Sequence, residues 1–239
     1  TIPTAHDNTD VSGNFSVYVP AGPYTIRFAP PRCVSLGAQR LANQLVSTAT
    51  NLGTITLPDA FAVTGRVLDQ ASNPVSGADL DFFDAVSGAR QATARDNTDA
   101  SGNFSVLVPD GVYNINIDPP SAINLLVGRV NSISVSGPTS LGDVILPSGI
   151  PVSGTVLGPG GSGVLNVDID VFQPSTSTFV RLAHDHTAAN GSFRVVVPAG
   201  TYDFRFIPPA CSTLAPAELK SVQVTSALTL PTVNLVQGV

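Results

Sequence analysis

Two pairs of aspartates beside an oxygen-rich turn are the residues of this chain best suited to hold a metal ion. Asp7 and Asp10 stand in the run DNTDVSGN, and Asp96 and Asp99 stand in DNTDASGN. Calcium prefers carboxylate and amide oxygens but takes about six to eight of them, and the EF-hand spacing and its closing glutamate are missing here. The four aspartates are therefore weak calcium candidates. The competing interpretation, which we favour, is that they accept hydrogen bonds from the backbone of their own turn.

Histidines flank the same turns and could ligate a transition metal. His184 and His186 are two positions apart, which places both on one face of a strand, with Asp185 between them. The position of His6 and His184 carries Arg95 in the middle copy of the turn, so a metal site shared by all copies is excluded. We expect solvated histidines, no metal site and no cofactor.

The two cysteines, Cys33 and Cys211, occupy equivalent positions in the repeat described below. Neither has a partner inside its own repeat. Two interpretations stay open: free thiols, or a disulfide to another repeat or another chain in an oxidising compartment. An extended array would keep the two too far apart to pair with each other.

No arrangement of nucleophile and base points to catalysis. Serine and aspartate are common, but no Ser, His and Asp surround a recognisable nucleophile elbow, and neither cysteine has a histidine in clear partnership. We expect no catalytic residues and no enzyme activity. Asn14, Asn103 and Asn190 each begin an N-x-S sequence, so a glycan is a candidate partner, although turn chemistry is the explanation we prefer.

The turns that carry these residues belong to a segment that occurs three times. It starts at His6, Arg95 and His184, so the period is 89 residues in both intervals (95 − 6 and 184 − 95). The first two copies are identical at 17 of 26 positions, which excludes chance. Repetition of one small unit is therefore the first fact about the fold.

Each copy contains two stretches in which apolar residues occupy every second position, as in half-buried strands. In the middle copy they run from Phe104 to Val108 and from Tyr113 to Ile117, and Pro109-Asp110-Gly111 joins them. Proline and glycine favour a tight reversal at this point. We expect the two stretches to pair as a hairpin, followed in the first copy by strands at Gln39 to Val46 and Thr54 to Leu57.

A complete repeat contains about seven short strands, with turns about every 8 to 12 residues and no helical period, which predicts an all-β, two-sheet sandwich. We expect three units: residues 1–60, an incomplete repeat, and residues 61–149 and 150–239, two complete repeats. Because the connections are very short, we expect a stiff, rod-like tandem array.

A fixed order of short motifs runs through the complete repeats. Val63 to Val67 and Val152 to Val156 read V-x-G-x-V, Asn73 to Ala78 reads N-P-V-x-G-A, and T-D-x-x-G-x-F and V-P-x-G-x-Y follow. This order resembles that of carboxypeptidase regulatory-like domains. The resemblance implies transthyretin-like (prealbumin-like) Greek-key sandwiches with an accessory, stalk or surface role and no activity of their own. The third repeat departs from the pattern, with Ala188 for the second aspartate and Gly158 to Gly163 for N-P-V-x-G.

The first repeat lacks a counterpart of Phe61 to Ala89, because residue 1 aligns with Arg90. That stretch supplies two strands and inward residues such as Val63 and Phe82. Losing several buried side chains at ~1.5–3 kcal/mol each removes on the order of 10 kcal/mol, comparable with the ~5–15 kcal/mol stability of a whole domain. We expect an upstream or neighbouring chain segment to complete this repeat, within a longer array or by donation between fibre subunits; irregular packing is the remaining alternative.

Composition narrows the class of protein. The net charge of −6 and a pI near 4.7 argue against a nucleic-acid partner, and no run approaches the roughly 18 apolar residues of a membrane span. We predict a non-catalytic extracellular or cell-surface protein, a stalk or surface-fibre subunit, whose partners are copies of itself or further repeats, end to end. The alternatives are an adhesive or carbohydrate-binding module, or accessory domains of a secreted hydrolase.

Overall fold

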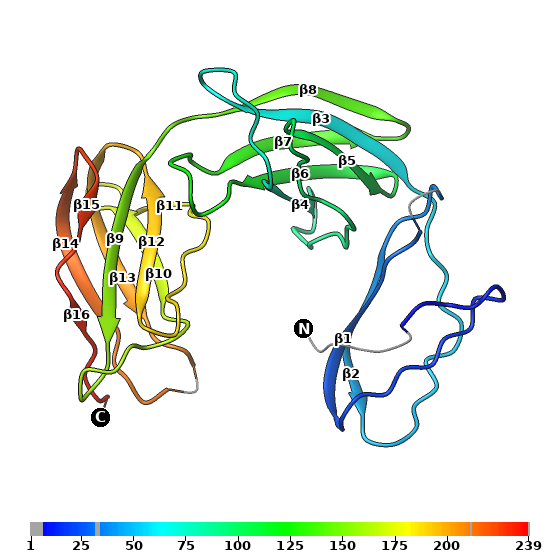
Figure 1. Cartoon of the computed structure of the whole chain (residues 1–239), viewed down its shortest axis with the longest axis horizontal. Helices are drawn as coiled ribbons and strands as arrows, with labels where there is room; N and C mark the ends of the chain where they lie inside the picture. Colours follow the sequence, from blue (N-terminus) through cyan, green and yellow to red (C-terminus); the bar gives the residue numbers. More distant parts are fainter. Residues whose placement is uncertain (1–6, 32–33, 211, 239) are drawn as a thin grey trace.

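The computed structural model describes residues 7–31, 34–210 and 212–238, and in them the chain forms strands and turns without a helix. The strands lie in three groups along the chain (Figure 1). The predicted all-β class is confirmed. Among the described residues there is accordingly no helix long and apolar enough to cross a membrane.

The middle repeat is a two-layer sandwich. Its strands are β3 (Phe61–Asp69), β4 (Asp79–Asp84), β5 (Asn103–Val108), β6 (Gly111–Asp118), β7 (Gly128–Val135) and β8 (Thr139–Leu146). One sheet has the order β5-β3-β8 and the other β4-β6-β7. The central strand β3 pairs antiparallel with β5 and parallel with β8. Alternate residues of both sheets meet in one core, whose largest members are fully buried: Leu80, Phe82, Ile115, Ile117 and Leu146.

The third repeat follows the same plan. Its strands are β9 (Ile150–Leu157), β10 (Asp168–Gln173), β11 (Thr178–Val180), β12 (Ser192–Val197), β13 (Gly200–Ile207), β14 (Ala217–Val224), β15 (Leu228–Thr229) and β16 (Val233–Asn234). One sheet has the order β11-β10-β13-β14, and in the other β9 lies between β12 and the short β15 and β16. Strands β15 and β16 take the place of β8. Pro231 separates them, and proline cannot donate to a strand ladder.

Strands β5 and β6 do not pair with each other, and neither do β12 and β13, so the predicted hairpin is wrong. The motif V-P-x-G-x-Y instead carries the chain from one sheet to the other. The hydroxyl of Tyr113 donates to the carbonyl of Pro109 at 3.0 Å, and that of Tyr202 to Pro198 at 3.1 Å, which makes each corner a tyrosine corner. Period-2 alternation indicates which side chains face inward but not which strand is the neighbour, and this explains the error.

The first repeat forms one two-stranded sheet, β1 (Gly22–Phe28) and β2 (Gln39–Val46), which corresponds to β6 and β7. The strands expected at residues 15–19 and at Thr54 to Leu57 do not form. Their counterparts, β5 and β8, both pair with β3, and the described part of the first repeat has no such central strand. One missing strand therefore leaves two segments unpaired.

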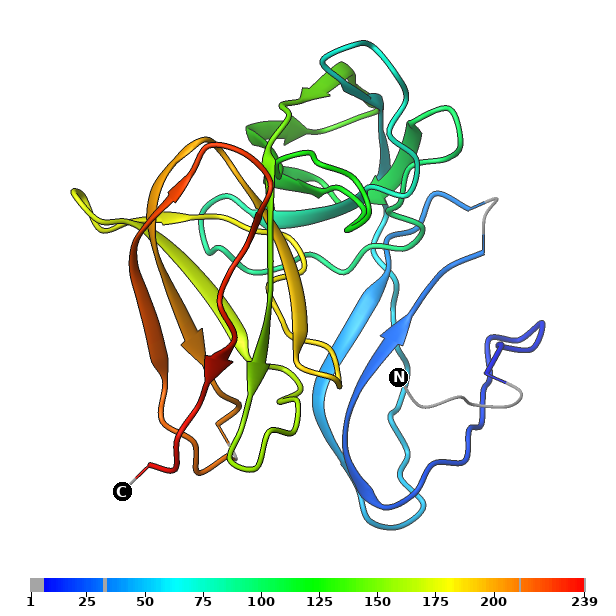
Figure 2. The same ribbon diagram turned by 60° about the vertical axis from the view of Figure 1, so that its left-hand side comes forward.

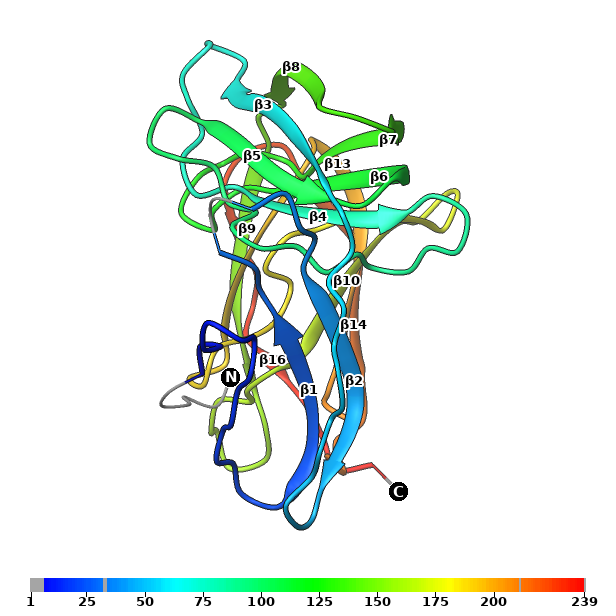
Figure 3. The same cartoon turned by 90° about the vertical axis from the view of Figure 1, so that its right-hand side faces the viewer.

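Each repeat closes with the same two backbone hydrogen bonds. The amide donors and carbonyl acceptors are Gly37 to Pro58 and Ala60 to Ser35, Leu126 to Pro147 and Gly149 to Asn124, and Ala215 to Val236 and Gly238 to Thr213. The repeats do not lie on one line, as a rod would require. The first and third lie on the same side of the middle one, and together they form an arch (Figures 1 and 2). Figure 3 looks onto the first repeat, with β1 and β2 in front of the third.

Candidate functional site

The turn aspartates Asp10 and Asp99 point at their own backbone. In each, Oδ1 accepts hydrogen bonds from the amides two and four residues further on, at 2.8–2.9 Å. These bonds, led by the amides of Asn14 and Asn103, hold the pKa of both carboxyls below its usual value. This geometry fits the interpretation that these aspartates accept hydrogen bonds from the backbone of their own turn.

The remaining predicted site residues are not gathered into one site. Asp96 Oδ2 accepts a hydrogen bond from the hydroxyl of Thr93, and Asp7 is exposed near the start of the described chain. In the residues that the structure describes, none of the four calcium candidates belongs to a group of three metal-ligating side chains. Cys33 and Cys211 lie outside the described residues, so their disulfide stays a prediction.

The asparagines of the three N-x-S sequences are exposed and take part in the turns. Asn14 and Asn103 donate through Nδ2 to the turn aspartate four residues earlier, at 3.2 and 3.3 Å. Asn190 Oδ1 instead accepts from the amide of Ser192 at 3.0 Å, and so replaces the aspartate that the third repeat lacks. A glycan on these residues stays a prediction.

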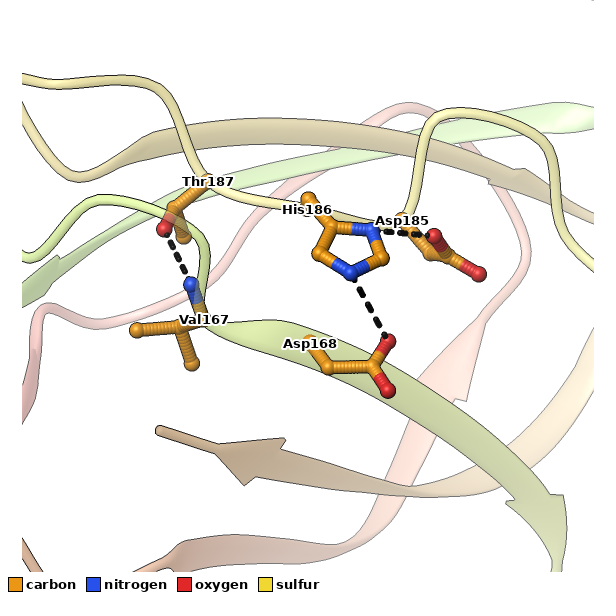
Figure 4. A network of polar contacts seen from close by, with 5 residues as sticks. All are labelled: Val167, Asp168, Asp185, His186 and Thr187. Carbon is orange, nitrogen blue, oxygen red and sulfur yellow. Dashed lines mark hydrogen bonds and ion pairs between the residues drawn. The ribbon is translucent and has the colours of Figure 1, made fainter. Parts of the chain in front are cut away.

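The described residues bring together one group that could hold a metal ion: Asp168, Asp185 and His186 (Figure 4), with ligand atoms within 4.8 Å of one another. Asp168 opens β10, and the loop that carries the other two forms a bridge to it. His186 Nδ1 lies 2.8 Å from Asp185 Oδ1, and His186 Nε2 lies 4.0 Å from Asp168 Oδ1. Thr187 fixes the loop, since its Oγ1 accepts from the amide of Val167 at 2.8 Å.

This group is open to solvent, with side-chain exposures of 56% for His186 and 42% for Asp168. Water therefore competes with any ion for the same ligands. His184, the other histidine of the predicted pair, does not join it. Its Nε2 lies 3.0 Å from the carbonyl oxygen of Pro119 in the middle repeat.

The middle repeat carries a related group of carboxylates on β4 and the adjoining loop. Burial, Asp96 and Asp81 raise the pKa of Asp79 there, as burial, Asp168 and Asp185 raise that of Asp170 in the third repeat. The basic residue differs. Arg90 pairs with Asp81 in the middle repeat, whereas the third has Phe179 at that position and places His186 beside Asp168 and Asp185. In both repeats the arrangement is therefore best explained as polar pairing between strand and loop.

The clearest difference between the repeats is the open inner face of the first. Six apolar positions of the repeat line the inside of the sandwich. In the two complete repeats all of them are at most 5% exposed: Phe104, Val106, Val108, Tyr113, Ile115 and Ile117, and Phe193, Val195, Val197, Tyr202, Phe204 and Phe206. In the first repeat all six are partly exposed: Phe15, Val17, Val19, Tyr24, Ile26 and Phe28. Among the described residues, these six inward positions are therefore left without a facing strand layer in the first repeat alone.

A second candidate interface lies where one repeat meets the next. Arg95 Nη1 donates to the carbonyl of Pro30 at 3.4 Å, and His184 makes the equivalent contact to Pro119. Donor and acceptor both shift by one period between the two joints. The sequence offers a signal for this contact, a basic residue and a Pro-Pro pair at constant spacing, but our sequence reasoning did not connect them.

The joint between the middle and third repeats has further contacts. The guanidinium of Arg194 donates to the carbonyl oxygen of Ser121 and to the side chain of Asn124. A Cβ on Gly149 would lie 2.5 Å from side-chain atoms of both Leu126 and Val196. The joint is therefore closely packed, not a free hinge.

Comparison with known proteins gives distant structural likenesses. No protein-family model matches the chain, and no curated protein matches it. Among solved structures, the Bacillus anthracis TIE protein is 12% identical, with 74% of this chain and 34% of that chain covered and a TM-score of 0.29. The shaft pilin SpaA from Lactobacillus rhamnosus GG is 9% identical (75% and 98% covered, TM-score 0.32), and a streptococcal ancillary pilin is 13% identical (92% and 76%, TM-score 0.31). At TM-scores this low, no property of these proteins is assigned to this chain.

Proposed function

We propose that this chain is a non-catalytic structural protein of the cell surface or extracellular space, a stalk or surface-fibre subunit built from repeats 1–60, 61–149 and 150–239. One observation carries the proposal: the six inward side chains that are buried in both complete repeats are partly exposed in the first. Two strands from an upstream or neighbouring chain segment would bury them and pair the unpaired segments.

The joints support an array of such units. Equivalent side chains contact the preceding repeat twice, and the same closing hydrogen bonds occur three times. Repeats joined through an equivalent contact can extend by adding neighbours, which is how stalks and fibres are built.

A fusion tests the proposal. We place a second copy of residues 61–89 ahead of residue 1 and measure amide hydrogen exchange. Exchange in residues 14–19 and 50–57 should slow by about tenfold or more, because these segments gain strand partners. A fusion of equal length and shuffled sequence is the control. Slow exchange already present in the unfused chain, at a concentration where it is a monomer, would contradict the proposal, since the first repeat would then be closed by its own residues.

The adhesive and hydrolase-accessory alternatives stay predictions. The aromatic pair Phe172 and Phe179, with ring centroids 5.6 Å apart and Phe179 49% exposed, is where stacking of a sugar should be sought first.

A further inference from the structure

We propose that the segment completing the first repeat is a strand–turn–strand piece with the pattern of residues 61–84, selected by two residues of the first repeat. Phe15 requires a glycine opposite it, and Thr9 holds the turn. This inference rests on the proposed completion and adds the chemistry by which the completing segment is recognised.

In both complete repeats a glycine of the central strand lies opposite a phenylalanine. Gly65 of β3 pairs with Phe104 of β5, and Gly154 of β9 pairs with Phe193 of β12. A Cβ on Gly65 would lie 2.6 Å from the Phe104 ring, and one on Gly154 would lie 2.7 Å from the Phe193 ring. At Gly65 a Cβ would also lie 2.8 Å from the carbonyl oxygen of Gly142. A larger residue would therefore force its neighbours to move, and the phenylalanine ring, the nearest group in both repeats, favours glycine at this point of the strand.

The first repeat has counterparts of the residues that surround this glycine. Phe15 is the counterpart of Phe104 and packs edge-on against Phe28, with ring centroids 5.4 Å apart. On the other side of the missing strand, Gly53 has a φ of 70°, and its counterpart Gly142 beside β3 has a φ of 65°. On each side of the missing strand, one local feature therefore matches its counterpart beside β3 or supports Phe15 from within the repeat.

Thr9 supplies the second requirement. Its counterpart Thr98 is buried, and its hydroxyl accepts from the amide of Ala78 at 2.8 Å and donates to the carbonyl of Val75 at 2.7 Å. Thr187 makes the same two bonds in the third repeat. Thr9 is exposed. A completing segment that includes the turn between its strands would give Thr9 the same partners, so a single strand is not sufficient.

Arg66 provides a matched control next to the critical glycine. It is exposed on β3, and its guanidinium pairs with Asp143 at 2.9 Å. In the first repeat, Thr54 occupies the position of Asp143. An arginine at this point of the completing segment would therefore not meet a carboxylate at that position.

Three labelled peptides covering residues 61–84 test the proposal: the natural sequence, Gly65→Ala and Arg66→Ala. Each is titrated against the full chain by fluorescence anisotropy, and amide exchange is followed in residues 14–19 and 50–57. We expect the natural and Arg66→Ala peptides to bind equally and to slow exchange. The Gly65→Ala peptide should bind about tenfold or more weakly, and a Phe15→Ala chain should reduce that difference. A Thr9→Val chain should bind the natural peptide about tenfold more weakly.

The outcomes separate this inference from the proposed function. Equal binding of all three peptides would overturn the glycine requirement and leave completion intact. Binding by none of them would overturn completion itself. A chain that doubles its mass and protects both segments without peptide would show that a second copy covers this face, and that result would also overturn the inference.

Discussion

At the scale of single residues, the tyrosine of V-P-x-G-x-Y determines how the chain passes between sheets. Burial raises the pKa of Tyr113 and of Tyr202, so both hydroxyls stay protonated and remain donors to their proline carbonyls. Tyr24 makes the same bond to Pro20 at 2.6 Å. The corner therefore forms even where the sandwich around it is incomplete.

Replacing Tyr113 or Tyr202 with phenylalanine should lower the free energy of unfolding of its repeat by about 0.5–1.5 kcal/mol, because one buried hydrogen bond is lost. Denaturant unfolding measures the change. Tyr18→Phe is the control, since Tyr18 is 94% exposed. An unchanged midpoint in both corner variants would show that the hydroxyl does not stabilise the crossing.

The stabilising effect of the turn aspartates should depend on pH. The pKa of Asp99 is lowered in the folded chain, first by the amide of Asn103, from a usual value of 3.8. Its stabilising effect is therefore complete above that value and is lost as the pH falls through the lower folded pKa. Asp99→Asn should be less stable than the natural chain at about pH 6, and the difference should shrink by about pH 2. Thermal unfolding across this range measures it, and a constant difference would contradict the assignment.

At the scale of elements, a threonine ties the repeated turn to the start of the second strand. Thr98 and Thr187 are 6% and 2% exposed, and each bonds one amide and one carbonyl across a separation of 20 to 23 residues. These bonds join the segment before β4 or β10 to the loop before β5 or β12. They explain why the repeated motif contains threonine at this position.

Thr98→Val should destabilise the middle repeat by about 1–3 kcal/mol, because it leaves a buried amide and a buried carbonyl without a partner. Thr98→Ser should retain most of the stability. Thr9→Val is the matched control in the chain alone, since Thr9 is exposed. Equal effects at positions 9 and 98 in denaturant unfolding would contradict this difference between the repeats.

At the scale of the whole molecule, the joints explain why the three repeats form an arch (Figure 1). Short connections alone would limit the distance between repeats but not their angle. His184 and Arg194 tie the third repeat to the end of the middle one, and Arg95 does the same one period earlier. The orientation of each repeat thus depends on side chains as well as on linker length.

A double substitution, His184→Ala with Arg194→Ala, should loosen the joint between the middle and third repeats. Small-angle scattering should show a broader distribution of distances and a larger radius of gyration. The free energy of unfolding of each repeat should stay within about 0.5 kcal/mol of its natural value. Arg205→Ala is the control, because Arg205 pairs with Glu218 within one sheet. An unchanged scattering curve for the double variant would show that the linker alone holds the angle.

Much of this architecture is readable from the sequence because it is periodic or local. The 89-residue period, the inward and outward sides of the strands and the absence of a counterpart of residues 61–89 all follow from positions counted along the chain. So does the turn chemistry of Asp10 and Asp99, since those bonds reach only two to four residues. The boundaries of the three units stay a prediction of the same kind.

Only the tertiary structure decided which strands are neighbours and which side chains meet across long separations. Alternation along Phe104 to Val108 is the same whether that strand pairs with β6 or with β3, and the sandwich requires β3. Asp168 meets His186, and Arg194 meets Ser121 and Asn124, through contacts that no spacing in the sequence specifies. The physical reason is that a repeated pattern records which face of a strand is buried, whereas the partner on that face is chosen by packing of the whole chain.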